Sequence, residues 1–213
     1  MPSLINFLLV MVLVLNLVAL GSSRLRAVIR IVALQGIILS VLPLILHRRW
    51  GLEAAVVSLA AVLLKGMIIP GMLMRALEQA KIKREVEPLI GLLPSMLLGA
   101  AATGSAILLT AGLPVAGTET APLLIPASLA TVMVGFILLT TRFKALSQVI
   151  GYLVLENGVF IFGMLLFEAM PAVVEMGVLL DLFVATFIIC IIVNHINRAF
   201  SSLDTRRLAE LRE

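Results

Sequence analysis

Residues that carry metal or redox chemistry are scarce in this chain of 213 residues. It has one cysteine, Cys190, so a disulfide within the chain is excluded. Its two histidines, His47 and His195, fall at opposite ends of the predicted membrane segments, so no metal site is expected. The sequence also lacks a glycine-rich phosphate loop and a nucleophile elbow. We therefore expect no catalytic residues, cofactor or metal on this chain, which by itself is not predicted to be an enzyme.

Charged residues are also scarce, at 13% of the chain, whereas 62% of residues are hydrophobic and the mean hydropathy is +1.18. Soluble domains are typically about 45–50% apolar. This excess of apolar residues predicts an all-α integral membrane protein surrounded by lipid. The first segment lacks the basic region and cleavage site of a secretory signal peptide, so we expect a retained helix. The net charge of +4 comes from basic residues between apolar runs, which indicates topology rather than nucleic-acid binding.

Seven apolar segments are each close to the length of about 20 residues that a spanning helix needs. They cover residues 3–20, 27–46, 51–80, 89–113, 122–140, 146–167 and 172–197. We predict about seven transmembrane helices in three parts. These parts are a four-helix membrane part over residues 1–113, a three-helix part over 114–200 and a cytoplasmic tail over 201–213.

Lysine and arginine are divided unequally between the two sides of these segments. One side has only Arg48 and Arg49. The other side has Arg24, Arg26, Arg30, Arg75, Lys81, Lys83, Arg84, Arg142, Lys144, Arg198, Arg206, Arg207 and Arg212. Because cytoplasmic loops carry the excess of basic residues, this asymmetry predicts an N-terminus outside and a C-terminus in the cytoplasm.

Three ionisable residues, Lys65, Glu156 and Asp181, lie inside the apolar segments. At 1.5 Å per residue, each lies roughly 14–20 Å from the start of its helix. That depth is near the middle of a hydrocarbon layer about 30 Å thick. A charge there costs about 3 kcal/mol on insertion scales. Three such residues at one level, with both signs, predict a set of polar groups across the bundle that handles charge.

Lys65 is followed by a proline that disturbs its helix. Pro70 lies five residues later and removes the hydrogen bond to the carbonyl of Gly66. The resulting kink would expose backbone polar groups beside the lysine. Because desolvation disfavours its charged form, Lys65 is a candidate for proton exchange. The alternative is a static ion pair between the lysine and a carboxylate.

Two further residues are candidates for a proton or ion pathway. Tyr152 lies one turn before Glu156 on the same helix face, within hydrogen-bond reach. His195 lies on a helical stripe with Asp181, about 21 Å nearer the cytoplasm. The alternatives are a neutral, hydrogen-bonded packing acid at Glu156 and an interfacial role for His195.

Small residues recur every four positions in the fourth segment, at Gly91, Ser95, Gly99 and Thr103. Ala100, Gly104 and Leu108 continue an adjacent stripe. Small side chains let another helix backbone approach closely. The stripe predicts close packing either within this chain or against another subunit.

Most of the chain resembles component E of hydrogenase-4. The resemblance is most specific in three elements near the C-terminus: the block Gly151–Gly158 (GYLVLENG), the segment Val174–Gly177 (VEMG), and Leu180–Asp181 followed by an apolar run to Arg198. The spacing of Lys65 and Pro70 and the ending Leu203–Asp204 are similar too. Members of that family are integral subunits of membrane-bound [NiFe] hydrogenases and formate hydrogenlyase-type complexes.

The resemblance implies a non-catalytic subunit in the cytoplasmic membrane of a prokaryote. The C-terminal part is similar to the K-type subunit of complex I and its counterpart in cation/proton antiporters, which place intramembrane acids on successive helices. Glu156 and Asp181 occupy comparable helices, although neither matches the position or residue type fully. The implied partners are lipid, antiporter-like membrane subunits, and the membrane, large and small hydrogenase subunits, which hold the [NiFe] and iron–sulfur centres.

The implied function is proton or Na⁺ translocation coupled to hydrogen chemistry on the partner chains. One alternative is a purely structural scaffold of such a complex, or of a related complex I-like assembly, that moves no ions. A second alternative is a self-standing transporter, although the sequence has no clear internal repeat.

Overall fold

The computed structural model describes residues 2–46, 52–79, 89–111 and 122–166. Within these ranges the chain forms helices joined by short turns and contains no strand. The elements are α1 (Pro2–Gly21), α2 (Leu25–Leu46), α3 (Leu52–Leu63), the π-helical segment η1 (Leu64–Ile68), α4 (Ile69–Gln79), α5 (Leu92–Thr110), α6 (Leu124–Thr141) and α7 (Ala145–Leu166).

Six spans in this part of the chain are long and apolar enough to cross a membrane. They correspond to the first six segments predicted from the sequence, and α3, η1 and α4 together form the third of them. The all-helical prediction is therefore confirmed for these residues, and the six spans are compatible with a multi-pass membrane protein. The seventh predicted segment, 172–197, lies outside the described residues.

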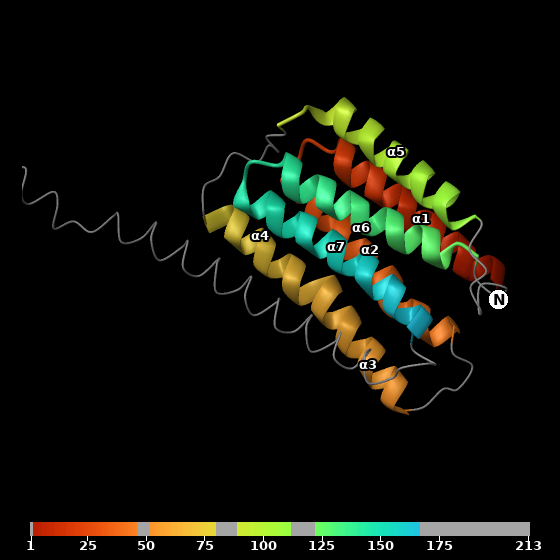
Figure 1. The fold of residues 1–213 in the computed structure, drawn as a ribbon. Coiled ribbons are helices and arrows are strands. Elements are labelled where there is room, and N and C mark those ends of the chain that lie inside the picture. Colours follow the sequence, from red (N-terminus) through yellow and green to blue (C-terminus); the bar gives the residue numbers. More distant parts are fainter. Residues whose placement is uncertain (1, 47–51, 80–88, 112–121, 167–213) are drawn as a thin grey trace, which may run out of the picture.

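The helices run side by side along a common direction (Figure 1). Helix α5 lies at one edge and contacts α1 and α6, while α3, η1 and α4 lie at the opposite edge and contact α2. Helices α1, α2, α6 and α7 fill the space between these edges, and α6 and α7 form an extensive interface. The two inner pairs come from distant parts of the sequence, so residues far apart in the chain meet at the centre.

Several helix connections gather at one end of the bundle. The Arg142 side chain, just after α6, donates to the carbonyl of Leu20 in α1. Arg26 at the start of α2 pairs with Glu78 near the end of α4. The backbone N–H of Leu89, ahead of α5, donates to the carbonyl of Thr141. Among the described residues, this basic end therefore brings together the positive charges that the sequence analysis assigned to one side.

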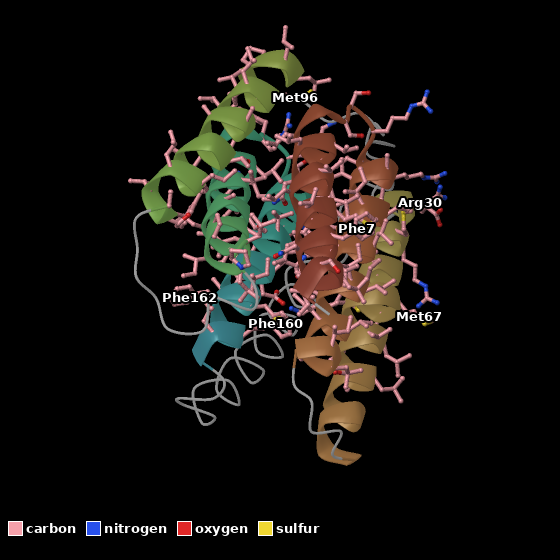
Figure 2. All side chains as sticks on the ribbon, turned by 90° about the vertical axis from the view of Figure 1, so that its right-hand side faces the viewer. Phe7, Arg30, Met67, Met96, Phe160 and Phe162 are labelled. Atoms are coloured by element: carbon pink, nitrogen blue, oxygen red, sulfur yellow. The ribbon has the colours of Figure 1, made fainter. Side chains whose placement is uncertain are left out.

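The buried apolar side chains form two clusters. The first lies toward the basic end and includes Leu20, Val32, Val134 and Val154. The second lies toward the other end and includes Val12, Leu39, Ala127 and Ile161. Large apolar side chains also cover the outside of the bundle, including Phe7, Met67 and Phe162 (Figure 2). An apolar exterior of this kind matches a lipid surrounding.

The small-residue stripe of α5 packs within the chain. Ser95 and Gly99 are buried, and a β-carbon at Gly99 would clash with the Leu20 side chain of α1. In the adjacent stripe, Gly104 has open space around it and Leu108 is 79% exposed. Of the two predicted roles, the structure shows packing inside the subunit for the first stripe.

Candidate functional site

A set of buried polar side chains separates the two apolar clusters. We call it the polar layer, and its members are Asn16, Gln35, Lys65, Thr131, Glu156 and Asn157. In each of four helices the polar residue lies between a residue of the first cluster and one of the second, as Gln35 lies between Val32 and Leu39. Gln35, Thr131 and Glu156 each lie about 15 Å from the basic end of their helix. The polar layer is therefore near the middle of the membrane-spanning segments.

Uncharged members of the polar layer form a continuous chain of hydrogen bonds across four helices. Asn157 Nδ2 of α7 donates to Gln35 Oε1 of α2 over 3.3 Å. Gln35 Nε2 donates to Asn16 Oδ1 of α1 over 2.8 Å, and Asn16 Nδ2 donates to Thr131 Oγ1 of α6 over 2.9 Å. The Thr131 hydroxyl in turn donates to the carbonyl of Ala127. Each of these buried groups is satisfied by a partner from another helix or from its own helix backbone.

The ionisable members, Lys65 and Glu156, form an ion pair between η1 and α7. Lys65 Nζ lies 2.8 Å from Glu156 Oε1, and their side chains are 10% and 7% exposed. The same ammonium group lies 4.8 Å from the centroid of the Phe160 ring, one turn later on α7. A lysine over an aromatic face gains up to about 2 kcal/mol when it is desolvated. The positive charge is therefore held by a carboxylate and a π-system at once.

The local backbone brings Lys65 close to α2. Lys65 lies in η1, a wider, π-helical turn. This turn directly precedes α4, the helix that carries Pro70. The predicted distortion beside Pro70 thus takes the form of a π-helical segment, a feature common at functional sites. A β-carbon at Gly36 of α2 would lie only 2.8 Å from Lys65 Cβ, and one at Gly66 would lie 2.6 Å from Ile37 Cγ1. The two glycines let η1 and α2 approach closely.

Glycines also set the position of Glu156 and Asn157. A β-carbon at Gly158 would lie 2.6 Å from the backbone nitrogen of Val132 in α6. A β-carbon at Gly151 would lie 2.8 Å from the backbone nitrogen of Leu139, and one at Gly135 of α6 would lie 2.5 Å from that of Leu155. Helices α6 and α7 therefore pack backbone against backbone above and below the polar layer, which fixes the depth of Glu156.

A small cavity adjoins the ion pair. It is lined by Lys65, Glu156 and Asn157 together with Gly36, Pro70 and apolar side chains of α2, α4 and α7. The cavity is small: the centre of a water-sized sphere can move through about 10 Å³ of it. This is about the space that one water molecule needs, and the three polar lining residues offer it partners. The cavity places space for one water directly beside the ion pair.

The chemistry available at this site is proton exchange. The Lys65 ammonium can pass a proton to the Glu156 carboxylate across 2.8 Å, which turns two buried charges into two neutral groups. In a low-dielectric interior the Coulomb attraction favours the ionic form and desolvation disfavours it, so burial narrows the free-energy gap between the ionic and neutral forms. Among the described residues no group of three or more metal-binding side chains is present.

The structure brings together two of the five residues that the sequence predicted for a pathway, Lys65 and Glu156. Tyr152 lies one turn earlier on α7, is half-buried and packs against the first apolar cluster. Asp181 and His195 lie outside the described residues. The pairing matches the static ion pair that was the alternative interpretation of Lys65, and it is also the arrangement that a proton exchange requires.

Sequence reasoning missed the uncharged members of the polar layer, Asn16, Gln35 and Thr131. A signal for two of them was present, since Asn16 and Gln35 are amide side chains within long apolar runs. It also missed the burial of Arg142, which was assigned to a basic loop but is 2% exposed.

Comparison with known proteins gives one informative match. The chain is 34% identical over 193 residues to a protein of Mycobacterium tuberculosis (strain ATCC 25618 / H37Rv) whose name is "Uncharacterized protein Rv0085". The match covers 89% of this chain and 87% of the mycobacterial protein. No family model and no solved structure matches the chain.

Proposed function

We propose that this chain, which belongs to the family of the mycobacterial protein, is a membrane subunit that exchanges protons at the Lys65–Glu156 pair. The observation that carries the proposal is this ion pair at mid-depth, beside a cavity of one-water size. A buried charge in a membrane helix is costly and usually marks an ion or proton path. Two opposite charges within proton-transfer distance indicate a proton path more specifically than either charge alone does.

A proton arriving through the cavity would protonate Glu156 and break the ion pair. Lys65 would then keep its contact with the Phe160 ring and could lose its proton in turn, because a desolvated ammonium without a carboxylate is unfavourable. Lys65 would give its proton to a water, and the starting ion pair returns when the protonated Glu156 passes its own proton to the neutral Lys65. Each step needs only the Lys65 and Glu156 side chains and one water.

The wider setting follows from the resemblance to component E of hydrogenase-4. In that setting the subunit lies in the prokaryotic cytoplasmic membrane, with seven helices, the N-terminus outside and the C-terminus in the cytoplasm. Antiporter-like subunits and the hydrogenase subunits are its partners, and hydrogen chemistry on the partners drives proton or Na⁺ movement. The gathering of Arg24, Arg26, Arg75 and Lys144 at one end supports this orientation.

The test is gradient formation in membranes of the native host that carry the variant Glu156→Gln. The substitution keeps the size of the side chain and removes its ability to bind and release a proton. Because the substitution also destabilises the bundle, proton uptake is compared per amount of subunit in the membrane. On that basis we expect little proton uptake into inverted vesicles during substrate turnover. Glu78→Gln is the matched control, because Glu78 pairs with Arg26 at the surface of the basic end. Unchanged proton uptake with Glu156→Gln would refute the proposed exchange.

The setting is tested separately by purification in a mild detergent. If the hydrogenase assignment is right, a hydrogenase large subunit and antiporter-like chains should be recovered with this subunit. Recovery with a different set of partners would overturn the assignment but leave the proton exchange at Lys65 and Glu156 to be judged by the vesicle experiment.

A second candidate function is a scaffold that holds neighbouring subunits and moves no ions. The chain of amide hydrogen bonds and the low exposure of the ion pair favour it, because both features join helices firmly. The double variant Lys65→Met with Glu156→Gln distinguishes the two functions. A scaffold predicts that the uncharged pair still supports full gradient formation, whereas proton exchange predicts that it does not.

A further inference from the structure

A second buried charge lies at the basic end, away from the polar layer. Arg142 immediately follows α6 and is 2% exposed. Its Nη2 donates to the carbonyl of Leu20 at the end of α1 over 2.7 Å. Its Nη1 is also buried and has no hydrogen-bond partner among the described residues. Nη2 of the guanidinium therefore caps the end of α1, whereas Nη1 lacks a hydrogen-bond acceptor among the described residues.

Ser147, in the first turn of α7, has a buried hydroxyl that lines the same cavity as Arg142. Its side chain is buried, and its hydroxyl has no hydrogen-bond partner in the part of the chain that the structure describes. Arg142 and Ser147 both line a cavity whose other walls are apolar: Ala19, Leu25, Val28, Leu138 and Ile150. In this cavity too, the centre of a water-sized sphere can move through about 10 Å³. Two unpaired polar groups thus face one small space between the α1–α2 turn and the α6–α7 turn.

The charge around this cavity is positive. Burial lowers the pKa of the Arg142 guanidinium, through desolvation, but arginine stays protonated at physiological pH. Within the described residues, the ion pairs are Arg26–Glu78 and Lys65–Glu156, so no carboxylate in them neutralises Arg142. The carbonyl end of α1 offsets part of the charge, whereas the amino end of α7 adds to it. An uncompensated buried guanidinium of this kind favours a bound anion.

We propose that this cavity binds a small monovalent anion of the size of chloride, held by Arg142 Nη1 and Ser147 Oγ. Size excludes phosphate, sulfate and carboxylate groups, because the space suits a single water-sized occupant. Chemistry favours an anion over water, because a water could donate one hydrogen to Ser147 Oγ but its other hydrogen would meet only the apolar walls, and a neutral water would not offset the guanidinium charge. A halide accepts from the guanidinium and from the serine hydroxyl at once.

The test measures the thermal unfolding midpoint of the complete chain in lipid nanodiscs while chloride or bromide replaces gluconate at constant ionic strength. We expect the midpoint to rise saturably with halide in the wild type. Ser147→Ala should weaken the apparent halide affinity about tenfold or more, because it removes one hydrogen bond to a charged ligand. Arg142→Gln should abolish the response, and Arg75→Gln should keep it, since that exposed residue carries the same charge outside the cavity.

Crystals grown in bromide supply a readout that does not depend on variants. An anomalous peak within hydrogen-bond distance of Arg142 Nη1 and Ser147 Oγ would support the site. A cavity occupied by water alone, or a wild-type midpoint that ignores halide, would overturn it. If Arg142→Gln does not fold, the Ser147→Ala comparison and the bromide peak still decide the question.

Discussion

Lys65 and Glu156 lie 91 positions apart in the sequence, yet their charged groups meet at 2.8 Å inside the bundle. Each comes from a segment that packs against α2: Gly36 and Gly66 let η1 approach α2 closely, and α7 contacts α2 as well. The pair is therefore a product of helix packing, and its free energy can be measured by changing each partner in turn.

A double-mutant cycle on Lys65→Met and Glu156→Gln should show strong coupling. Removal of one partner of a buried ion pair leaves an uncompensated charge and costs about 3–5 kcal/mol. The double variant should lose far less than the sum of the single losses, because no buried charge remains. Unfolding in nanodiscs, followed by circular dichroism, measures all four proteins. Additive losses would show that the two side chains do not interact.

The surface pair of Arg26 and Glu78 should contribute little to stability. Its atoms lie 3.1 Å apart, but the side chains are 37% and 62% exposed, so solvent screens the attraction. Glu78→Gln should change the free energy of unfolding by less than about 1 kcal/mol, and the change should shrink further at high salt. The same unfolding measurement at two salt concentrations checks this. A large loss that ignores salt would contradict it.

Thr131→Val should weaken the bundle more than Thr140→Val, although the two substitutions are chemically the same. Thr131 accepts from Asn16 Nδ2, so its loss leaves a buried amide hydrogen without a partner and costs roughly 1–3 kcal/mol. Thr140 is exposed, and its hydroxyl donates to backbone carbonyls of its own helix. Thermal midpoints of the two variants measure the difference. Equal effects would show that the chain of amides adds no stability.

Gly158→Ala and Gly163→Ala should have opposite effects on stability, although both lie on α7. A β-carbon at Gly158 would meet the Val132 backbone at 2.6 Å, so α6 and α7 must separate, at a cost of roughly 1–3 kcal/mol. Among the described residues, nothing lies within 4 Å of a β-carbon at Gly163. There the alanine should stabilise the helix by about 0.5–1 kcal/mol. Helix unfolding measured in the same lipid compares the two directly.

The helices and the charged residues were predictable because each has a local signal. A run of about 20 apolar residues marks a membrane helix wherever its neighbours lie. The predicted and observed ends of the described helices therefore differ by only a few residues. Lys65 and Glu156 stand out in the same way, since a single charge interrupts an apolar run. Their pairing was not predictable, because it depends on which helices become neighbours.

The uncharged residues of the polar layer carry weaker signals. Asn16 and Gln35 interrupt their apolar segments with uncharged amides, and Thr131 is nearly neutral in hydropathy, so none of the three marks a buried charge. Their importance comes from meeting one another, which the sequence does not encode locally. Arg142 shows a related limit: counting basic residues assigns a side of the membrane, but it does not distinguish a solvated loop from a guanidinium that caps another helix.

The amide chain from Asn157 through Gln35 to Asn16 also has a consequence for assembly. Each helix can slide along its neighbours in lipid with little change in apolar contact, since the lipid is as apolar as the side chains. A slip of α2 by one turn, about 5.4 Å, would carry Gln35 away from both amides and into hydrocarbon. The amides therefore fix the register of the helices: four apolar helices could pack at many relative heights, but only one of these heights forms every hydrogen bond of the chain.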